Sequence, residues 1–257
     1  MVLAFVGWLI SVRKVSSISI SQYLSGLRII HLKKGVWPTS LRPDIVKSIL
    51  KGHEHEAMKT RIPRLPMTIP VMRLLKKKLT MSKMPLSDKR LLWAVCCIAL
   101  HGSFRIHELL SRNEMAFDPI TLLGKDLRKL QIKLEGKLED VMVIHLKHPK
   151  EDSLGKGVNI ELFSTNTVTC PVDAFVKWQK ASTLRINQVK PLFRFENGKC
   201  LTGATFNKVL KYLLYKHIDY DEGKFLGHSF RSGFASISHS QAFMAYCKTG
   251  RGSRMKE

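Results

Sequence analysis

Hydrophobic residues recur at intervals of three and four over the first 50 residues, which is the spacing of one face of an α-helix. One apolar run covers residues 2–10, and a second follows Ser19, a residue type that favours a helix N-cap. A third helix is expected from about Pro43 to Leu50, because proline is tolerated in the first turn of a helix. The pattern predicts a helical domain over residues 1–58.

Residues 59–70, with the sequence KTRIPRLPMTIP, interrupt this helical pattern. Closely spaced prolines exclude both a regular helix and a central strand. The basic side chains are expected to keep the segment solvated and to let it follow a phosphate backbone. We therefore predict a linker here, followed by a second domain of residues 71–257.

The pattern changes twice within the second domain. Residues 88–101 are apolar on nearly all sides, which predicts a helix at the centre of the core. Strand-like runs follow at residues 127–134, 141–146 and 158–163, and the last two are joined by a hairpin connection with a proline and two glycines. From Pro171 onward the pattern is helical again. The expected fold class is mainly α with a small antiparallel sheet.

Charge narrows the range of partners. The chain has 43 Lys and Arg against 20 Asp and Glu, a net charge of +23, and 44% of its residues are hydrophobic. A folded chain this basic repels itself unless a polyanion neutralises it, which favours nucleic acid, with an anionic membrane surface as the rival. No apolar stretch approaches the roughly 18 residues that cross a bilayer. We therefore expect nucleic acid and no membrane as the partner.

The cysteines do not suggest a metal site. They are odd in number and no pair has the C-x-x-C spacing of a zinc ligand set. Reduced thiols in an intracellular protein are the simplest interpretation. No metal and no cofactor are expected.

Two short segments place basic side chains next to expected helix ends, where they are candidates for binding an anion. Arg105 follows the apolar helix, and Glu108 lies three residues further on, close enough to orient it. His228 and Arg231 stand at a helix start expected near Ser229, with His228 at the N-cap, where both can face an anion. A surface arginine after a helix and an ordinary helix start would give the same patterns, so neither segment is decisive by itself.

Further basic residues are candidates for contact with a polyanion. Lys150 lies in the predicted hairpin, where a lysine is usually solvated but can also reach into a neighbouring site. The N-terminal domain and the linker add candidate DNA-binding residues, namely Arg28, Lys33, Lys34, Arg61 and Arg64.

The ordered set of these residues resembles the tyrosine recombinases (the phage-integrase-like family), especially the integrases of Crypton and DIRS-type mobile elements. Arg105 with Glu108 resembles the first arginine box, Lys150 the lysine of the hairpin, and His228-Ser-Phe-Arg231 the H-x-x-R box. The resemblance implies a helical, SAM-like core-binding domain at residues 1–58, followed by a DNA breaking-rejoining catalytic domain.

The family's reaction implies a role for each of these side chains. A tyrosine attacks a DNA phosphate and forms a 3′-phosphotyrosine, while Arg105 and Arg231 would grip the non-bridging oxygens. His228 would supply a third donor, and Lys150 would protonate the leaving 5′-oxygen. Double-stranded DNA is the implied partner, in the integration and recombination of a mobile element, without a metal.

The sequence departs from the family after Arg231. Few residues follow this position, and Tyr246, the only tyrosine among them, comes too early to be the expected nucleophile. We expect the catalytic domain to be incomplete at its C-terminus, the enzyme to be inactive as it stands, and the helix through which family members associate on DNA to be missing, so that the protein is a monomer off DNA.

Two alternatives stay open at this point. One is a catalytically inactive DNA-binding module derived from a transposon. The other is a basic RNA-binding protein, although the sequence has no aromatic stacking signature of the RRM kind. Work on DNA would place a eukaryotic protein in the nucleus.

Overall fold

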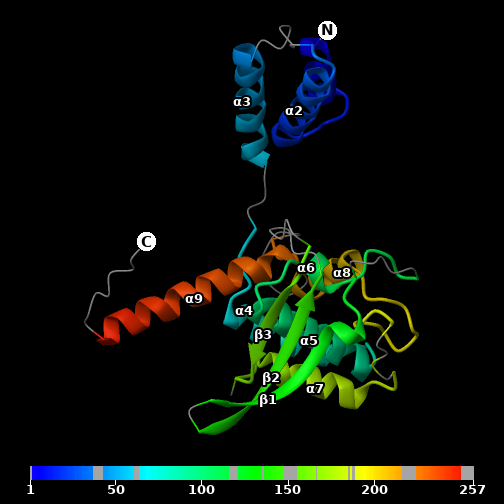
Figure 1. The fold of residues 1–257 in the computed structure, drawn as a ribbon, viewed down its shortest axis with the longest axis vertical. Helices are drawn as coiled ribbons and strands as arrows, with labels where there is room; N and C mark the ends of the chain where they lie inside the picture. Colours follow the sequence, from blue (N-terminus) through cyan, green and yellow to red (C-terminus); the bar gives the residue numbers. More distant parts are fainter. Residues whose placement is uncertain are drawn as a thin grey trace. The chain divides into compact units, whose positions relative to one another are not determined.

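The computed structural model describes residues 2–36, 43–60, 64–115, 121–134, 136–147, 155–165, 167–184, 186, 189–215 and 224–249. The chain divides into two compact units, Met1–Pro63 and Arg64–Glu257. The fold is mainly helical with one three-stranded antiparallel sheet (Figure 1), which confirms the expected fold class. Among the described helices, none is both long and apolar enough to cross a membrane.

The first unit consists of α1 (Val2–Ser11), α2 (Ser17–Lys33) and α3 (Pro43–Thr60). Ser16, rather than Ser19, caps α2, because Ser16 has an extended backbone and its hydroxyl accepts the Ser19 N–H at 3.3 Å. The predicted cap was therefore wrong by three residues.

Helix α3 is longer than expected. It continues to Thr60, ten residues past the end of its apolar pattern at Leu50. The added turns are polar and solvent-exposed over most of their length, and no proline interrupts them before Pro63. An exposed helical extension of this kind has no apolar periodicity by which it could be predicted. The core of the first unit is small and consists of Val6, Leu9, Ile20, Val46 and Leu50.

The second unit begins with an extended segment that was expected to be solvated linker. The Leu65 N–H donates to the carbonyl of Lys224 at 2.9 Å, and the Met67 N–H donates to the carbonyl of Ser229 at 2.7 Å. The Met67 side chain is fully buried. The expectation that this segment is solvated does not hold for residues 65–67, because an apolar side chain and two backbone hydrogen bonds join them to the rest of the second unit.

A glycine makes this docking possible. A Cβ atom at Gly233 would lie 2.3 Å from the Met67 carbonyl oxygen, so no larger residue fits between α9 (His228–Thr249) and the extended segment. Helix α4 then begins at Ile69, with Pro70 in its first turn.

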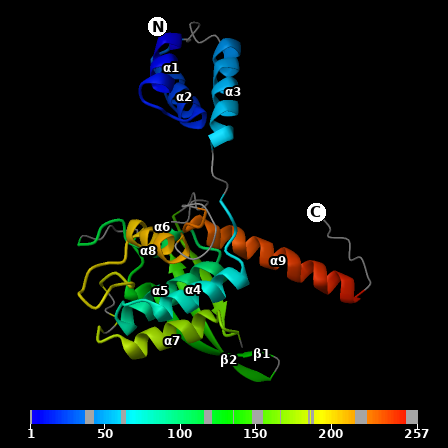
Figure 2. The same ribbon diagram turned by 180° about the vertical axis from the view of Figure 1, so that it is seen from behind.

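The remaining helices enclose one core. They are α4 (Ile69–Met81), α5 (Leu86–His101), α6 (Ile106–Leu109), α7 (Pro171–Ala181), α8 (Gly203–Tyr215) and α9 (His228–Thr249). Every residue of α5 from Leu91 to Leu100 is buried, as its all-round apolar sequence predicts. Figure 2 shows α4, α5 and α7 together on one side of the sheet. The position of the core is thus set by α5.

The sheet has the order β1-β2-β3, with β1 at Leu127–Leu134, β2 at Lys137–Leu146 and β3 at Val158–Phe163. A single 3-10 turn, η1 (Gly124–Asp126), leads into β1. The pairing is regular, so alternate residues of each strand share a face. One face carries the buried residues of the core and the opposite face is turned toward the viewer in Figure 1.

Candidate functional site

Arg105 is held in place by Glu108. One carboxylate oxygen of Glu108 accepts the backbone N–H of Arg105 at 2.7 Å, and the other accepts a hydrogen bond from the guanidinium at 3.1 Å. The side chain of Arg105 remains 28% exposed. A single carboxylate therefore orients both the start of α6 and the guanidinium, while the guanidinium can still reach a ligand.

The turn before Arg105 is fixed by the core. Ser103 has a φ of +50°, a left-handed conformation that few residues other than glycine adopt, and Phe104 is completely buried. Unfavourable backbone conformations persist where the surrounding packing imposes them. The buried ring of Phe104 therefore fixes the position from which Arg105 projects.

His228 and Arg231 lie on one side of the first turn of α9. The helix begins at His228, so this residue is the first helical position rather than the expected N-cap. Ser229 and Phe230 are fully buried, whereas His228 is exposed and Arg231 is partly exposed. Residues three apart in a helix share a face. The imidazole and the guanidinium are thus presented together on the surface.

A close backbone contact brings the start of α9 to α6. A Cβ atom at Gly227 would lie 2.6 Å from Cγ2 of Ile106, and the Gly227 N–H donates to Oδ1 of Asn207 at 2.9 Å. Gly227 directly precedes His228, and Ile106 directly follows Arg105. The structure therefore places the Arg105 segment and the His228 segment on two elements that touch.

The hairpin lysine and one linker arginine cannot be placed. Lys150 and Arg61 lie outside the described residues, as does the side chain of Tyr246 near the end of α9. Arg28, Lys33 and Lys34 belong to the first unit and are exposed, and Arg64 is exposed at the start of the second unit. Their assignment to DNA binding stays a prediction.

Sequence reasoning did not single out Lys147, which follows the last residue of β2. Its Nζ lies 2.8 Å from Oδ2 of Asp126 and donates to the carbonyl of Thr121 at 3.2 Å. Asp126 is 6% exposed and also accepts the Leu123 N–H at 2.8 Å. This largely buried ion pair joins the base of the β2–β3 hairpin to η1. Its partners are far apart in the sequence, so no local pattern could reveal it.

Among the scaffold groups whose pKa values are shifted, His101 and Cys170 lie beside α5 and α7. Burial lowers the pKa of His101, whose Nε2 lies 3.2 Å from the hydroxyl of Thr169. Burial alone would raise the pKa of the Cys170 thiol, but hydrogen bonds from the N–H groups of Thr165 and Asp173 help to hold it below its usual value. Both groups support the packing around α5 and α7 rather than the arginine cluster. Within the described part of the chain, no group of three or more His, Cys, Asp or Glu side chains is placed to hold a metal.

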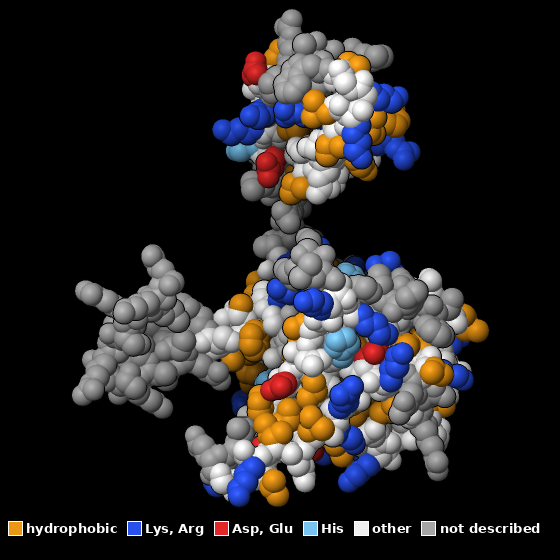
Figure 3. Space-filling view, viewed as in Figure 1, with side chains coloured by type: hydrophobic (Ala, Val, Ile, Leu, Met, Phe, Trp, Pro, Cys, Tyr) orange, Lys and Arg blue, Asp and Glu red, His pale blue; other side chains and the backbone are white. Residues whose placement is uncertain are grey.

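The basic residues are exposed over much of the second unit. Figure 3 shows Lys and Arg side chains distributed over the face that carries the open side of the sheet, with few acidic groups among them. Such a face attracts a polyanion over a distance comparable to the Debye length.

The structure is similar to solved structures of tyrosine recombinases. XerH recombinase bound to its difH substrate has 13% identity and a TM-score of 0.45, over 91% of this chain and 62% of that one. An FLP recombinase–Holliday junction complex has 13% identity and a TM-score of 0.44, over 84% and 52%. The Tn1549 transposon integrase with circular intermediate DNA has 16% identity and a TM-score of 0.41, over 84% and 72%.

This chain spans less than two thirds of the XerH and FLP chains that it matches. No protein-family model matches the sequence, and no curated protein matches it. Likeness at these TM-scores does not decide the function, which has to be inferred from the residues of this chain.

Proposed function

We propose that the second unit binds double-stranded DNA and holds one backbone phosphate with Arg105, His228 and Arg231, as the resemblance to tyrosine recombinases implies. The observation that carries the proposal is the contact of Gly227 with Ile106, which joins a carboxylate-oriented arginine to the start of α9. Two guanidinium groups and an imidazole match the oxygens of a phosphate and supply the charge that it needs.

The overall charge supports the same ligand. A net charge of +23 gives a strong, salt-dependent affinity for DNA, since each phosphate contact releases counterions. Within this proposal, residues 1–58 act as the core-binding domain and residues 71–257 as the catalytic domain. The acidic residue Glu108 is engaged by Arg105, so it adds little repulsion at the phosphate.

The chemical step of an active recombinase would use the same groups. A tyrosine oxygen attacks the phosphorus and displaces the 5′-oxygen of the DNA, which takes a proton from Lys150, while the tyrosine proton leaves to solvent. Arg105 and Arg231 would stabilise the extra charge on the non-bridging oxygens in the transition state. Strand transfer of this kind is the reaction of DNA integration and recombination.

A specific observation favours a second candidate, a DNA-binding module that does not cut. Helix α9 runs without interruption from His228 to Thr249. At 1.5 Å per residue, Tyr246 lies about 22 Å from Arg231 along the helix axis. Tyr246 is therefore too far from the arginine cluster to attack a phosphate held there.

Duplex DNA binding, measured by fluorescence anisotropy at low salt, tests the shared part of both candidates. We expect Arg105→Ala and Arg231→Ala each to weaken binding by roughly 10- to 100-fold, since a charged hydrogen bond contributes about 1.5–3 kcal/mol. Arg73→Ala, which removes an exposed arginine from α4, is the matched control and should have a much smaller effect. Absence of DNA binding by the unmodified protein would overturn the proposal.

A nicked duplex that traps covalent intermediates separates the two candidates. A protein–DNA adduct that survives denaturant would identify an active recombinase. DNA binding without an adduct would identify the silent module.

A further inference from the structure

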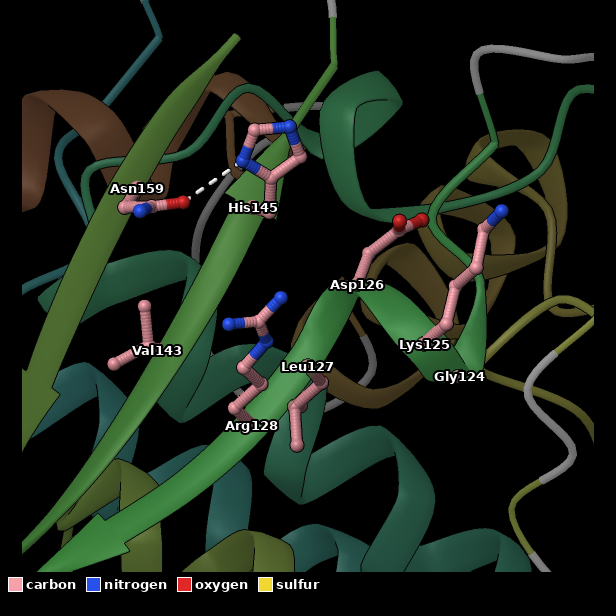
Figure 4. A pocket seen from close by; sticks show the side chains of 8 residues that line it. All are labelled: Gly124, Lys125, Asp126, Leu127, Arg128, Val143, His145 and Asn159. Carbon is pink, nitrogen blue, oxygen red and sulfur yellow. Dashed lines mark hydrogen bonds between the residues drawn. The ribbon is translucent and has the colours of Figure 1, made fainter.

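The open face of the sheet carries a pocket that the arginine cluster does not use. The pocket measures about 680 Å³ and lies where η1 enters β1, beside the end of β2 and the start of β3. Its lining residues are Gly124, Lys125, Asp126, Leu127, Arg128, Val143, His145 and Asn159 (Figure 4). All of these residues belong to the second unit.

Two cations of the lining are available to a ligand. The Arg128 side chain extends across the sheet so that its guanidinium lies between Val143 and Asp126, below the ring of His145 (Figure 4). Arg128 and Lys125 are both exposed, and neither side chain has a hydrogen-bond or ion-pair partner among the described residues. Among the described residues, therefore, no group competes with an anion for these two charges.

Asp126, the one acidic residue among the described residues of the lining, already has a partner. Asp126 is paired with Lys147 at 2.8 Å and accepts the Leu123 N–H. Its carboxylate therefore repels an anion much less than an unpaired one would. The charge that the pocket offers is that of Arg128 and Lys125.

Asn159 is oriented as a further donor by its hydrogen bond with His145. Nδ1 of His145 lies 2.8 Å from Oδ1 of Asn159, and because this oxygen can only accept, Nδ1 carries the proton. The amide NH₂ of Asn159 is then left as a donor, and Nε2 of His145 faces away from this bond. Gly157 has a φ of +72°, and a Cβ atom there would lie 2.7 Å from the imidazole, so the backbone fixes one side of the ring.

We infer that this pocket binds a phosphate group through Arg128, Lys125 and the Asn159 amide, with His145 orienting that amide. A planar guanidinium suits two phosphate oxygens, and the amide supplies a neutral donor. The phosphate can come from a DNA backbone, in which case the site rests on the proposed function and adds a contact distinct from the Arg105 cluster. It can also belong to a free phosphate-bearing ligand.

Titration with inorganic phosphate, followed by the NMR signals of the His145 ring, tests the pocket directly. Chloride at equal ionic strength is the reference. We expect a saturable shift with phosphate alone, which Arg128→Gln abolishes. Lys133→Gln removes an exposed cation from the same strand outside the pocket and should leave the shift intact. A shift that is absent, or equal with chloride, would overturn the inference.

The salt dependence of duplex DNA binding identifies the source of the phosphate. If the DNA backbone occupies the pocket, Arg128→Gln should make the negative slope of log K against log salt shallower by about one. Lys133→Gln should change this slope less. Equal effects of both variants on the slope, with a phosphate shift present, would assign the pocket to a free phosphate-bearing ligand. If the unmodified protein binds phosphate here but does not bind DNA, the proposed function is wrong, while the inference that the pocket binds phosphate is supported.

Discussion

The two units of the chain bury their apolar residues to very different extents. Among its described residues, the core of the first unit has five, and large side chains such as Trp8, Tyr23 and Ile30 are about half exposed. The second unit has one continuous core in which α5 is enclosed along most of its length. A unit of about 60 residues buries a smaller share of its surface than a larger one. The second unit is therefore better able to hold side chains in a fixed geometry.

The surroundings of the candidate DNA-binding residues differ between the two units in the same way. Arg105 and Arg231 stand directly beside completely buried phenylalanines, Phe104 and Phe230. The basic residues of the first unit, such as Arg28 and Lys33, project from an exposed helix surface. We therefore expect the second unit to supply geometry and the first to supply charge to a common polyanion.

The largest effect is expected from a cavity in the core of the second unit. Phe206 is buried against Phe230, with ring centroids 5.8 Å apart. Phe206→Ala should lower the free energy of unfolding by about 3–5 kcal/mol, because it removes a large buried ring and leaves a cavity. Denaturant unfolding, followed with probes in each unit, measures the loss.

Ile20→Ala is the counterpart in the first unit, since Ile20 is fully buried there. Its effect should be confined to the transition of the first unit, as that of Phe206→Ala should be confined to the second. If either substitution shifts both transitions equally, the units unfold together and the comparison fails.

Two glycine substitutions, one in each unit, should change the free energy of unfolding by smaller amounts and in opposite directions. Gly227→Ala directs a methyl group into Ile106 and should cost about 1–3 kcal/mol through overpacking, with weaker DNA binding as the α6–α9 contact shifts. Gly26, inside α2, has no atom within 4 Å of an added Cβ, so Gly26→Ala should stabilise the first unit by about 0.5–1 kcal/mol. Thermal unfolding measures both changes in stability. If the Gly227→Ala protein is as stable as the parent and binds DNA as tightly, the proposed role of the Gly227–Ile106 contact is wrong.

The smallest effect concerns pH. Because burial lowers the pKa of His101, the unfolded state takes up a proton more readily than the folded state. The contribution of His101 is therefore complete above its unfolded pKa, about 6.5, and is lost as pH falls toward the lower folded pKa. Denaturant midpoints of the second unit at pH 7.5 and pH 5 should differ less in His101→Gln than in the parent. An unchanged difference would show that other groups carry the pH dependence.

Much of the fold could be predicted because its signals are local. The all-round apolar sequence of α5 and the strand runs ending at Leu146 and Phe163 lie where the pattern put them. Strand β2 begins four residues earlier than predicted, at Lys137, because its polar first residues pair with β1 without any apolar alternation. The docking of Met67 was missed for a similar reason, since its partners are backbone groups of α9.

The sequence by itself determined the pairs that helix geometry keeps together. Glu108 is three residues from Arg105, and Arg231 is three from His228, so each pair lies within one helical turn wherever its helix forms. It also determined the charge that favours a polyanion.

Only the tertiary structure decided which of these pairs meet. The approach of α9 to α6 depends on Gly227 fitting against Ile106. The pocket on the sheet depends on the register that pairs Arg128 with Val143 and His145 with Asn159. These contacts join residues far apart in the chain, and they form because the buried core leaves the backbone few alternative positions. Local periodicity contains no information about such contacts.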